Sequence, residues 1–161
     1  MTAPTPAKLR LDGHCLIVLE RTLRAASPAE GCALLLGTRH NACLSLQRIW
    51  PCSNCWEPVE ERPRRFRIDP REQLLAQRWC RERGLQVLGA AHSHPSSEAV
   101  PSATDLQLCL GPTLMLIHSG LSEGLAALRA WWIQDADTAG APLELTLEAS
   151  PAATGAGDLG E

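Results

Sequence analysis

Apolar and polar residues along the chain follow two different periods, which predict strands in some segments and helices in others. Short apolar runs, bounded by glycine, proline or polar residues, are typical of strands. The expected strands are a short edge strand at residues 8–13 and further strands at residues 31–37, 43–50, 66–68, 85–94, 113–118, 124–134 and 143–147. Apolar residues three or four positions apart predict a helix at residues 14–26, and further helices are expected at residues 69–83 and 102–110. Strands that alternate with helices indicate one domain of the mixed α/β class.

The helix expected at residues 69–83 has the clearest end signals. Asp69 suits the N-cap, Pro70 the first helical position and Glu72 the third, and Gly84 follows the last turn. At the other end of the chain, residues 150–161 are rich in alanine, glycine and proline and contain too few apolar side chains to order themselves. We therefore expect a domain at residues 1–149 and a flexible C-terminal tail at residues 150–161.

Composition narrows the possible partners and the cellular setting. The net charge of −3 over 161 residues gives no reason to expect nucleic acid, whose binding proteins carry a strongly basic face. Residues 1–10 lack the apolar core of a signal peptide, and no apolar run is long enough to cross a membrane. Seven cysteines, an odd number at irregular spacing, favour reduced thiols and a cytoplasmic location.

One short segment carries most of the candidate chemistry. His92 and His94 lie at the end of the strand expected at residues 85–94, and side chains two positions apart in a strand point to the same face. Asp105 lies eleven positions after His94, at the start of an expected helix. Two imidazoles and one carboxylate are the protein ligands of a catalytic zinc ion, which keeps its fourth position for water. The pattern therefore predicts a zinc site at a strand–helix junction.

The same residues resemble a known motif. The order His92-Ser93-His94-Pro95, six residues, Ser102, two residues and Asp105 is similar to the motif of the JAMM (MPN-plus) metalloproteases. This resemblance implies a single MPN-type domain, with a curved mixed β-sheet flanked by helices. It extends from about Leu9 to Gln134, although only the motif block is specific.

The resemblance also implies an activity. Members of the short bacterial branch hydrolyse a peptide or isopeptide bond at the C-terminal tail of a ubiquitin-like or sulfur-carrier protein. By that likeness His92, His94 and Asp105 would bind Zn²⁺, and Ser102 would stabilise the oxyanion formed during hydrolysis. The protein substrate would present an extended C-terminal tail, and neither nucleic acid nor a membrane is an expected partner.

Hydrolysis of an amide also needs a group that accepts a proton and returns it to the leaving amine. Glu30 is the best candidate, because it precedes the strand expected at residues 31–37, and Glu30-Gly31-Cys32 is similar to the catalytic glutamate context of JAMM proteins. A solvated glutamate in a turn is the alternative interpretation. Competing candidates for the same role are Glu57, Glu60, Glu61 and Glu98.

Other patterns have simpler explanations or leave the function open. Ser102-x-x-Asp105 is also a helix capping box, which is compatible with metal binding. Cys52 and Cys55 imitate half of a zinc site, but no second pair of ligands accompanies them. A non-catalytic zinc-containing interaction module and a small-peptide hydrolase remain alternative functions. The sequence does not decide the physiological substrate, which loops such as residues 51–63 would recognise, or the oligomeric state.

Overall fold

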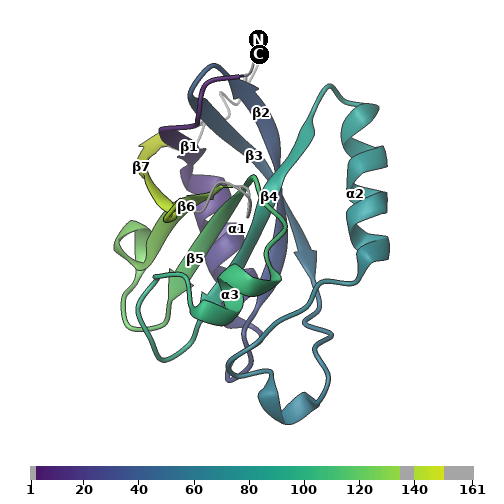
Figure 1. Cartoon of the computed structure of the whole chain (residues 1–161), viewed down its shortest axis with the longest axis vertical. Helices are drawn as coiled ribbons and strands as arrows, with labels where there is room; N and C mark the ends of the chain where they lie inside the picture. Colours follow the sequence, from purple (N-terminus) through teal and green to yellow (C-terminus); the bar gives the residue numbers. More distant parts are fainter. Residues whose placement is uncertain (1–2, 135–139, 151–161) are drawn as a thin grey trace, which may run out of the picture.

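The computed structural model describes residues 3–134 and 140–150, in which seven strands form one closed mixed sheet (Figure 1). The strand order around the sheet is β1-β3-β2-β4-β5-β6-β7. The strands are β1 (Lys8–Asp12), β2 (Cys32–His40), β3 (Cys43–Cys52), β4 (Gln86–His94), β5 (Thr113–Ser119), β6 (Leu128–Ile133) and β7 (Leu143–Ser150). The expected mixed α/β class is confirmed.

The N-terminal strand closes the sheet. β1 pairs in parallel with β3, where Leu9 lies opposite Leu44, and in parallel with β7, where Leu9 lies opposite Leu147. The prediction of an edge strand at residues 8–13 is therefore wrong, because both sides of β1 are paired. Pairing between strands so distant in sequence cannot be deduced from the apolar pattern of either strand. β4 and β5 are also parallel, and the remaining neighbours are antiparallel.

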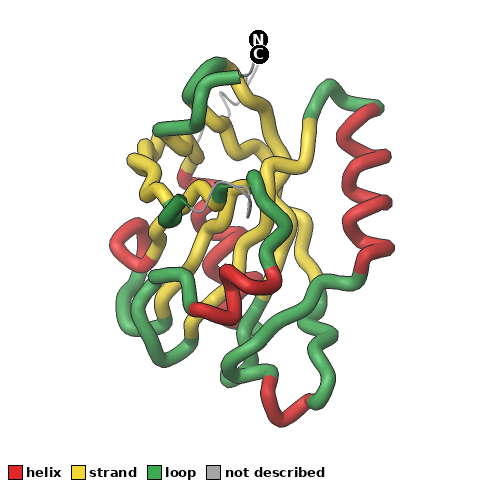
Figure 2. Tube along the Cα trace, viewed as in Figure 1, coloured by secondary structure: helices red, strands yellow, loops and turns green. Residues whose placement is uncertain are grey.

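Two longer helices cover opposite faces of the sheet (Figures 1 and 2). α1 (Gly13–Arg24) begins where the Asp12 side chain accepts a hydrogen bond from the Cys15 amide. α2 (Pro70–Arg81) begins with Asp69 as its N-cap, and the chain leaves it through Gly84, which has a positive φ of 67°. Only glycine adopts that φ readily, so Gly84 marks the turn after the helix as expected, although the helix ends at Arg81 and not at the predicted Arg83.

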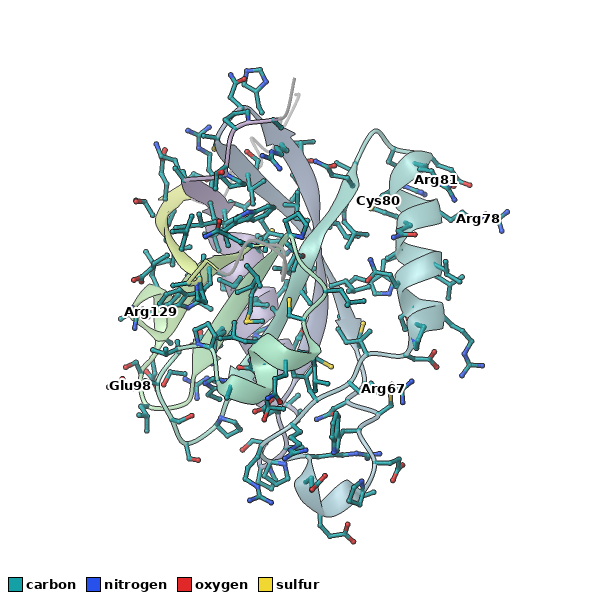
Figure 3. All side chains as sticks on the ribbon, in the orientation of Figure 1. Arg67, Arg78, Cys80, Arg81, Glu98 and Arg129 are labelled. Carbon is teal, nitrogen blue, oxygen red and sulfur yellow. The ribbon has the colours of Figure 1, made fainter. Side chains whose placement is uncertain are left out.

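Strand β2 is buried on both faces, as its continuous apolar sequence suggests. Leu35 packs with Leu19 and Leu23 of α1 in the main core. Leu34 and Leu36, which point the other way, pack with Ala76 and Cys80 of α2. Figure 3 shows Cys80 on the side of α2 that faces the sheet, whereas Arg78 and Arg81 point to solvent. The two cores hold β2 and β4 firmly between the helices.

The segment at residues 66–68 is not a strand, contrary to the prediction. The Arg67 amide donates to the side chain of Asn54, and the Arg67 carbonyl accepts from the Cys55 amide. A side chain and a neighbouring loop therefore satisfy the backbone that a strand partner would otherwise satisfy. The preceding residues, expected to be irregular, contain one short 3₁₀ turn, η1 (Val59–Glu61).

Other expected elements have different bounds. The strand predicted at residues 124–134 begins only at Leu128, because a 3₁₀ turn, η2 (Gly124–Ala127), starts at a glycine with a φ of 62°. The last expected helix is α3 (Ala103–Leu108), which is shorter than predicted. β7 includes Ser150, and residues 151–161 of the predicted tail lie outside the described residues. No helix in the described part of the chain is long and apolar enough to cross a membrane.

Candidate metal centre

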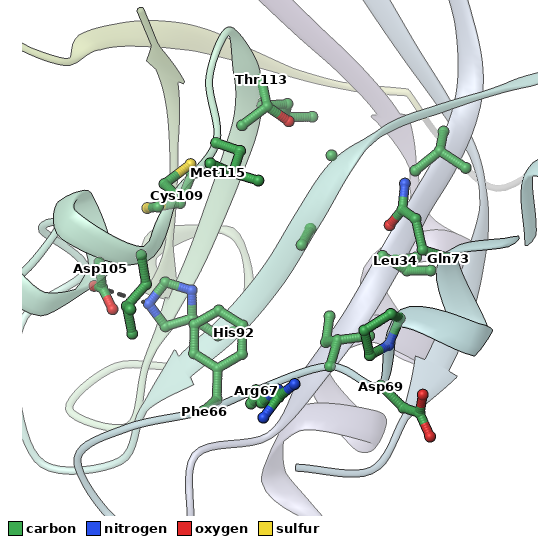
Figure 4. A pocket seen from close by; sticks show the side chains of 18 of the residues that line it. Leu34, Phe66, Arg67, Asp69, Gln73, His92, Asp105, Cys109, Thr113 and Met115 are labelled. Atoms are coloured by element: carbon green, nitrogen blue, oxygen red, sulfur yellow. Dashed lines mark hydrogen bonds and ion pairs between the residues drawn. The ribbon is translucent and has the colours of Figure 1, made fainter. Parts of the chain in front are cut away.

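Three side chains meet where β4 ends and α3 begins. His92 Nε2 lies 3.1 Å from His94 Nε2 and 3.0 Å from Asp105 Oδ2, and His94 Nε2 lies 3.1 Å from the same oxygen. All three residues are buried. Figure 4 shows His92 between Asp105 on one side and the ring of Phe66 on the other.

The size of this triangle fits a tetrahedral metal ion. Ligand atoms about 2.0–2.1 Å from a zinc ion lie about 3.3 Å from one another, close to the separations observed. Two imidazole nitrogens that face each other and one carboxylate oxygen are also the donor set that zinc prefers. The residues predicted from the sequence are therefore brought together as a group that could hold a metal ion.

The two histidine rings are oriented in different ways. His94 Nδ1 lies 2.7 Å from the Glu98 carbonyl, and donation to that oxygen leaves the Nε2 lone pair facing the centre. The His92 ring instead stacks on Phe66, with ring centroids 4.5 Å apart and an angle of 20° between the planes. Its Nδ1 is buried without a hydrogen-bond partner among the described residues. On the Nδ1 side, packing against Phe66 rather than a hydrogen bond therefore orients the His92 ring.

Asp105 is fixed by the helix that it helps to begin. The Ser102 amide donates to Asp105 Oδ2 over 2.9 Å, and the Asp105 amide donates to Ser102 Oγ over 3.0 Å. This is a complete capping box, so the same carboxylate both caps α3 and faces the histidines. Burial raises the pKa of Asp105, but its hydrogen bonds with His92 and His94 outweigh that effect and hold the pKa far below its usual range. The carboxylate is thus ionised, as a metal ligand must be.

Glu30 is buried next to this group, just before β2, with an exposed fraction of 4%. Burial, together with the negative charge of Asp105, raises the pKa of Glu30 to about 8. One oxygen of its carboxyl group is buried without a hydrogen-bond partner among the described residues. The competing candidates Glu57, Glu60 and Glu98 are exposed, and the half-buried Glu61 accepts a hydrogen bond from Trp56.

Ser93, between the two histidines, connects Glu30 to the candidate metal centre. Its side chain points to the face opposite the histidines and accepts a hydrogen bond from the Gly31 amide over 2.8 Å. The Ser93 amide in turn donates to the Gly31 carbonyl. A Cβ atom at Gly31 would lie only 2.5 Å from the Leu23 carbonyl oxygen, so glycine permits the close packing here. These contacts fix the backbone beside Glu30 against β4.

The buried Glu30 carboxyl group gives the metal-free protein a predictable pH dependence. The unfolded chain loses this proton near the ordinary pKa of 4.5, whereas the folded protein keeps it up to about pH 8. Between these values the folded state binds the extra proton, so its free energy of unfolding falls by about 1.4 kcal/mol per pH unit as the pH rises. We expect Glu30→Gln to lack this slope. Urea unfolding of both chelated proteins at about pH 5 and about pH 8 measures it, and identical slopes would contradict the prediction.

The cysteine pair and the other titratable groups form no comparable centre. Cys52 and Cys55 are free thiols, and burial raises the pKa of Cys52 to about 11, so it stays protonated at neutral pH. Among the residues that the structure describes, no group of metal-binding side chains other than His92, His94 and Asp105 converges.

A groove leads to the centre between α2 and α3. It encloses about 890 Å³ and reaches His92 and Asp105 (Figure 4). Leu74 of α2 lines one side, and Leu108 and Leu110 line the other. Residues of the sheet also line it: Leu34, Val87, Gly89, Ala90 and Met115. Of the loop that the sequence suggested for recognition, residues 51–63, only Trp56 lines this groove.

Two features near the site were missed from the sequence. Phe66 lies in a segment expected to be a strand, and its contact with His92 depends on a loop that brings it back over β4. Leu74, Leu108 and Leu110 are exposed leucines, which a sequence pattern does not distinguish from ordinary surface residues. The fact that the chain has a single phenylalanine was the one available signal for Phe66.

The chain is similar to two proteins named desampylase. A desampylase from Pyrococcus furiosus is 32% identical over 139 residues, which cover 82% of this chain and 91% of that protein. A desampylase from Haloferax volcanii is 34% identical over 86 residues, covering 53% of this chain and 58% of that protein.

Solved structures show the same architecture. The solution structure of a Desulfitobacterium hafniense protein matches with a TM-score of 0.77 and 29% identity, covering 89% of this chain and 93% of that one. A JAB1/MPN domain protein from Archaeoglobus fulgidus, 18% identical over 86% of this chain and 97% of that one, has the same fold with a TM-score of 0.51. The family described as prokaryotic homologues of the JAB domain matches residues 15–134. With its His-His-Asp group inside that match, the chain belongs to this prokaryotic branch of the JAMM/MPN family.

Proposed function

We propose that this protein is a zinc-dependent hydrolase that cleaves a peptide or isopeptide bond at the C-terminal tail of a ubiquitin-like protein. The observation that carries the proposal is the His92–His94–Asp105 triangle with the buried carboxyl group of Glu30 beside it. Membership of the JAB family and the similarity to two proteins named desampylase support a hydrolase that acts on ubiquitin-like modifier conjugates.

The residues of the site have complementary roles in this reaction. His92, His94 and Asp105 would hold the ion, and a bound zinc ion would supply Lewis acidity that polarises the scissile carbonyl group and makes water more acidic. Glu30, whose carboxyl group is buried beside the ligands, accepts the proton of the attacking water and delivers it to the leaving amine, and the positive charge of a bound zinc ion would favour the ionised form that this role needs. The hydroxyl group of Ser102 accepts from the Asp105 amide, so its own proton is free to donate to the oxyanion.

The groove supports an extended tail as the substrate. An unfolded C-terminal segment can lie between Leu74 and Leu108 and reach His92, whereas a folded domain has to remain outside. The lining is mostly apolar, so the bound tail gains affinity from apolar side chains several residues before the scissile bond. Arg65 and Arg67 also line the groove and would favour a carboxylate on the substrate.

A pair of adjacent leucines tests the path of the tail. Leu74 and Leu75 are 66% and 54% exposed on α2, but only Leu74 lines the groove. We expect Leu74→Asp to raise KM about tenfold with kcat little changed, because burying a leucine contributes about 1.5–3 kcal/mol. Leu75→Asp is the matched control and should leave KM unchanged. Equal effects of the two substitutions in steady-state assays would exclude this path.

The proposed function itself is tested with the zinc-loaded protein. We expect cleavage of a ubiquitin-like protein that carries a C-terminal extension, detected by mass spectrometry, and no cleavage after zinc is removed. Equally rapid cleavage of short unrelated peptides would favour a small-peptide hydrolase instead. Stoichiometric zinc without cleavage of any substrate would favour a non-catalytic module.

A further inference from the structure

Asn54 has an unusual number of contacts for a loop residue. It lies in the connecting segment, residues 53–69, which joins β3 to α2. Its Nδ2 donates to the carbonyl groups of Glu30 over 3.0 Å and Arg65 over 2.9 Å. Its Oδ1 accepts from the amides of Trp56 over 3.0 Å and Arg67 over 3.2 Å. Nδ2 also lies 3.5 Å from the Arg62 carbonyl oxygen, so one side chain contacts five backbone groups, four within the connecting segment and one at Glu30.

The first of these contacts fixes the backbone of Glu30. The Glu30 carbonyl accepts from Asn54, and the Glu30 amide donates to the Arg62 carbonyl over 2.8 Å. Both backbone polar groups of Glu30 are therefore held by the connecting segment, while the next residue, Gly31, is held by Ser93 of β4. The backbone that carries the Glu30 carboxyl group is fixed from two sides.

The other contacts fix the residues on either side of Phe66. The Asn54 side chain donates a hydrogen bond to the Arg65 carbonyl and accepts one from the Arg67 amide, and these two residues flank Phe66 directly. Phe66 stacks on His92, and His92 has no hydrogen-bond partner at Nδ1 among the described residues. The orientation of the His92 ring thus depends on a loop that has little regular structure of its own and that Asn54 holds in place.

We propose that Asn54 is a positioning residue, which holds Glu30 and Phe66 in register with His92 although it contacts neither the ion site nor the substrate. The expected effect of Asn54 on turnover rests on the proposed function, whereas its contacts with the backbone do not. Small displacements of a reacting group can lower a rate about 10²-fold, so an indirect role of this kind has a measurable consequence.

A double-mutant cycle tests the proposal. We expect Asn54→Ala to lower kcat by about 10–10²-fold with KM and zinc content little changed. In a Glu30→Gln background the same substitution should cause a clearly smaller further loss, because the part of the loss that arises through Glu30 is gone and only the part through Phe66 remains. Ser53→Ala, at the exposed neighbouring residue, is the matched control and should retain full activity. Equal losses in both backgrounds would overturn the proposal.

Amide hydrogen exchange tests the contacts without relying on activity. In full-length Asn54→Ala, the amides of Trp56 and Arg67 lose their acceptor and should exchange at least about tenfold faster, whereas amides of β5 should not change. Uniformly faster exchange would indicate loss of global stability and overturn the positioning role. Asn54→Asp keeps the acceptor but removes the donor, so it should release Glu30 while Trp56 and Arg67 stay protected. If these local changes in exchange occur but the wild-type protein cleaves no substrate, the proposed function is wrong, whereas the structural role of Asn54 in holding Glu30 and Phe66 is supported.

Discussion

Glu30→Gln is expected to lower kcat by about 10²–10⁴-fold, the usual contribution of a general acid–base group. Glutamine has nearly the same shape but accepts no proton from water, so substrate binding and zinc content should remain near those of the wild type. The measurement combines steady-state cleavage of a C-terminally extended ubiquitin-like protein with zinc analysis by mass spectrometry. This result would separate the chemical role of Glu30 from a structural one.

Glu98→Gln is the matched control for this substitution. Glu98 is exposed, and only its backbone carbonyl contacts the site, through His94. Its replacement should leave turnover unchanged. A Glu30→Gln protein with wild-type turnover would rule out Glu30 as the proton carrier, and Glu61 would then be the next residue to examine.

His92→Ala is expected to abolish stoichiometric zinc binding and, with it, hydrolysis. Loss of a residue that only supports a ligand commonly weakens metal binding about 10–10²-fold, and loss of a ligand itself should exceed that. Zinc content after purification without chelator, followed by competition with a coloured zinc indicator, measures the effect. His94→Ala should behave in the same way, because the two nitrogens are equivalent corners of the triangle.

His40→Ala serves as the control, because His40 is an exposed histidine at the end of β2, far along the strand from Glu30. It should bind zinc like the wild type. Since His92→Ala also removes a ring from a packed contact with Phe66, circular dichroism must show that the variant is folded. A folded His92→Ala protein with one tightly bound zinc ion would refute the assigned site.

The site could be predicted from the sequence where its residues are linked by short-range structure. His92 and His94 share a face because they are two positions apart in a strand, and Asp105 reaches them because Ser102 begins a helix three residues earlier. These relationships depend on local backbone geometry alone. The expected ligands therefore converge even though several strand bounds were wrong.

The remaining features depend on contacts that no local pattern encodes. Closure of the sheet requires β1 to meet β7 from the far end of the chain, and neither strand differs in sequence from an edge strand. The hydrogen bonds of Asn54 join its side chain to backbone carbonyl groups. Every residue has such a group, so no residue type in the sequence marks the partner. Phe66 reaches His92 only because those bonds shape the connecting segment.

Helix α3, which has six residues, contributes both to the candidate metal centre and to the groove proposed for the substrate tail. Its first turn supplies Asp105, and its last residue, Leu108, lines the groove. A tail that settles against Leu108 and steadies this helix must, by thermodynamic reciprocity, increase the affinity for the cation by the same factor that the cation increases the affinity for the tail. The substrate-bound enzyme would then bind zinc more tightly than the free enzyme. At limiting zinc concentrations, the ion would be found mainly on enzyme molecules that have a tail bound.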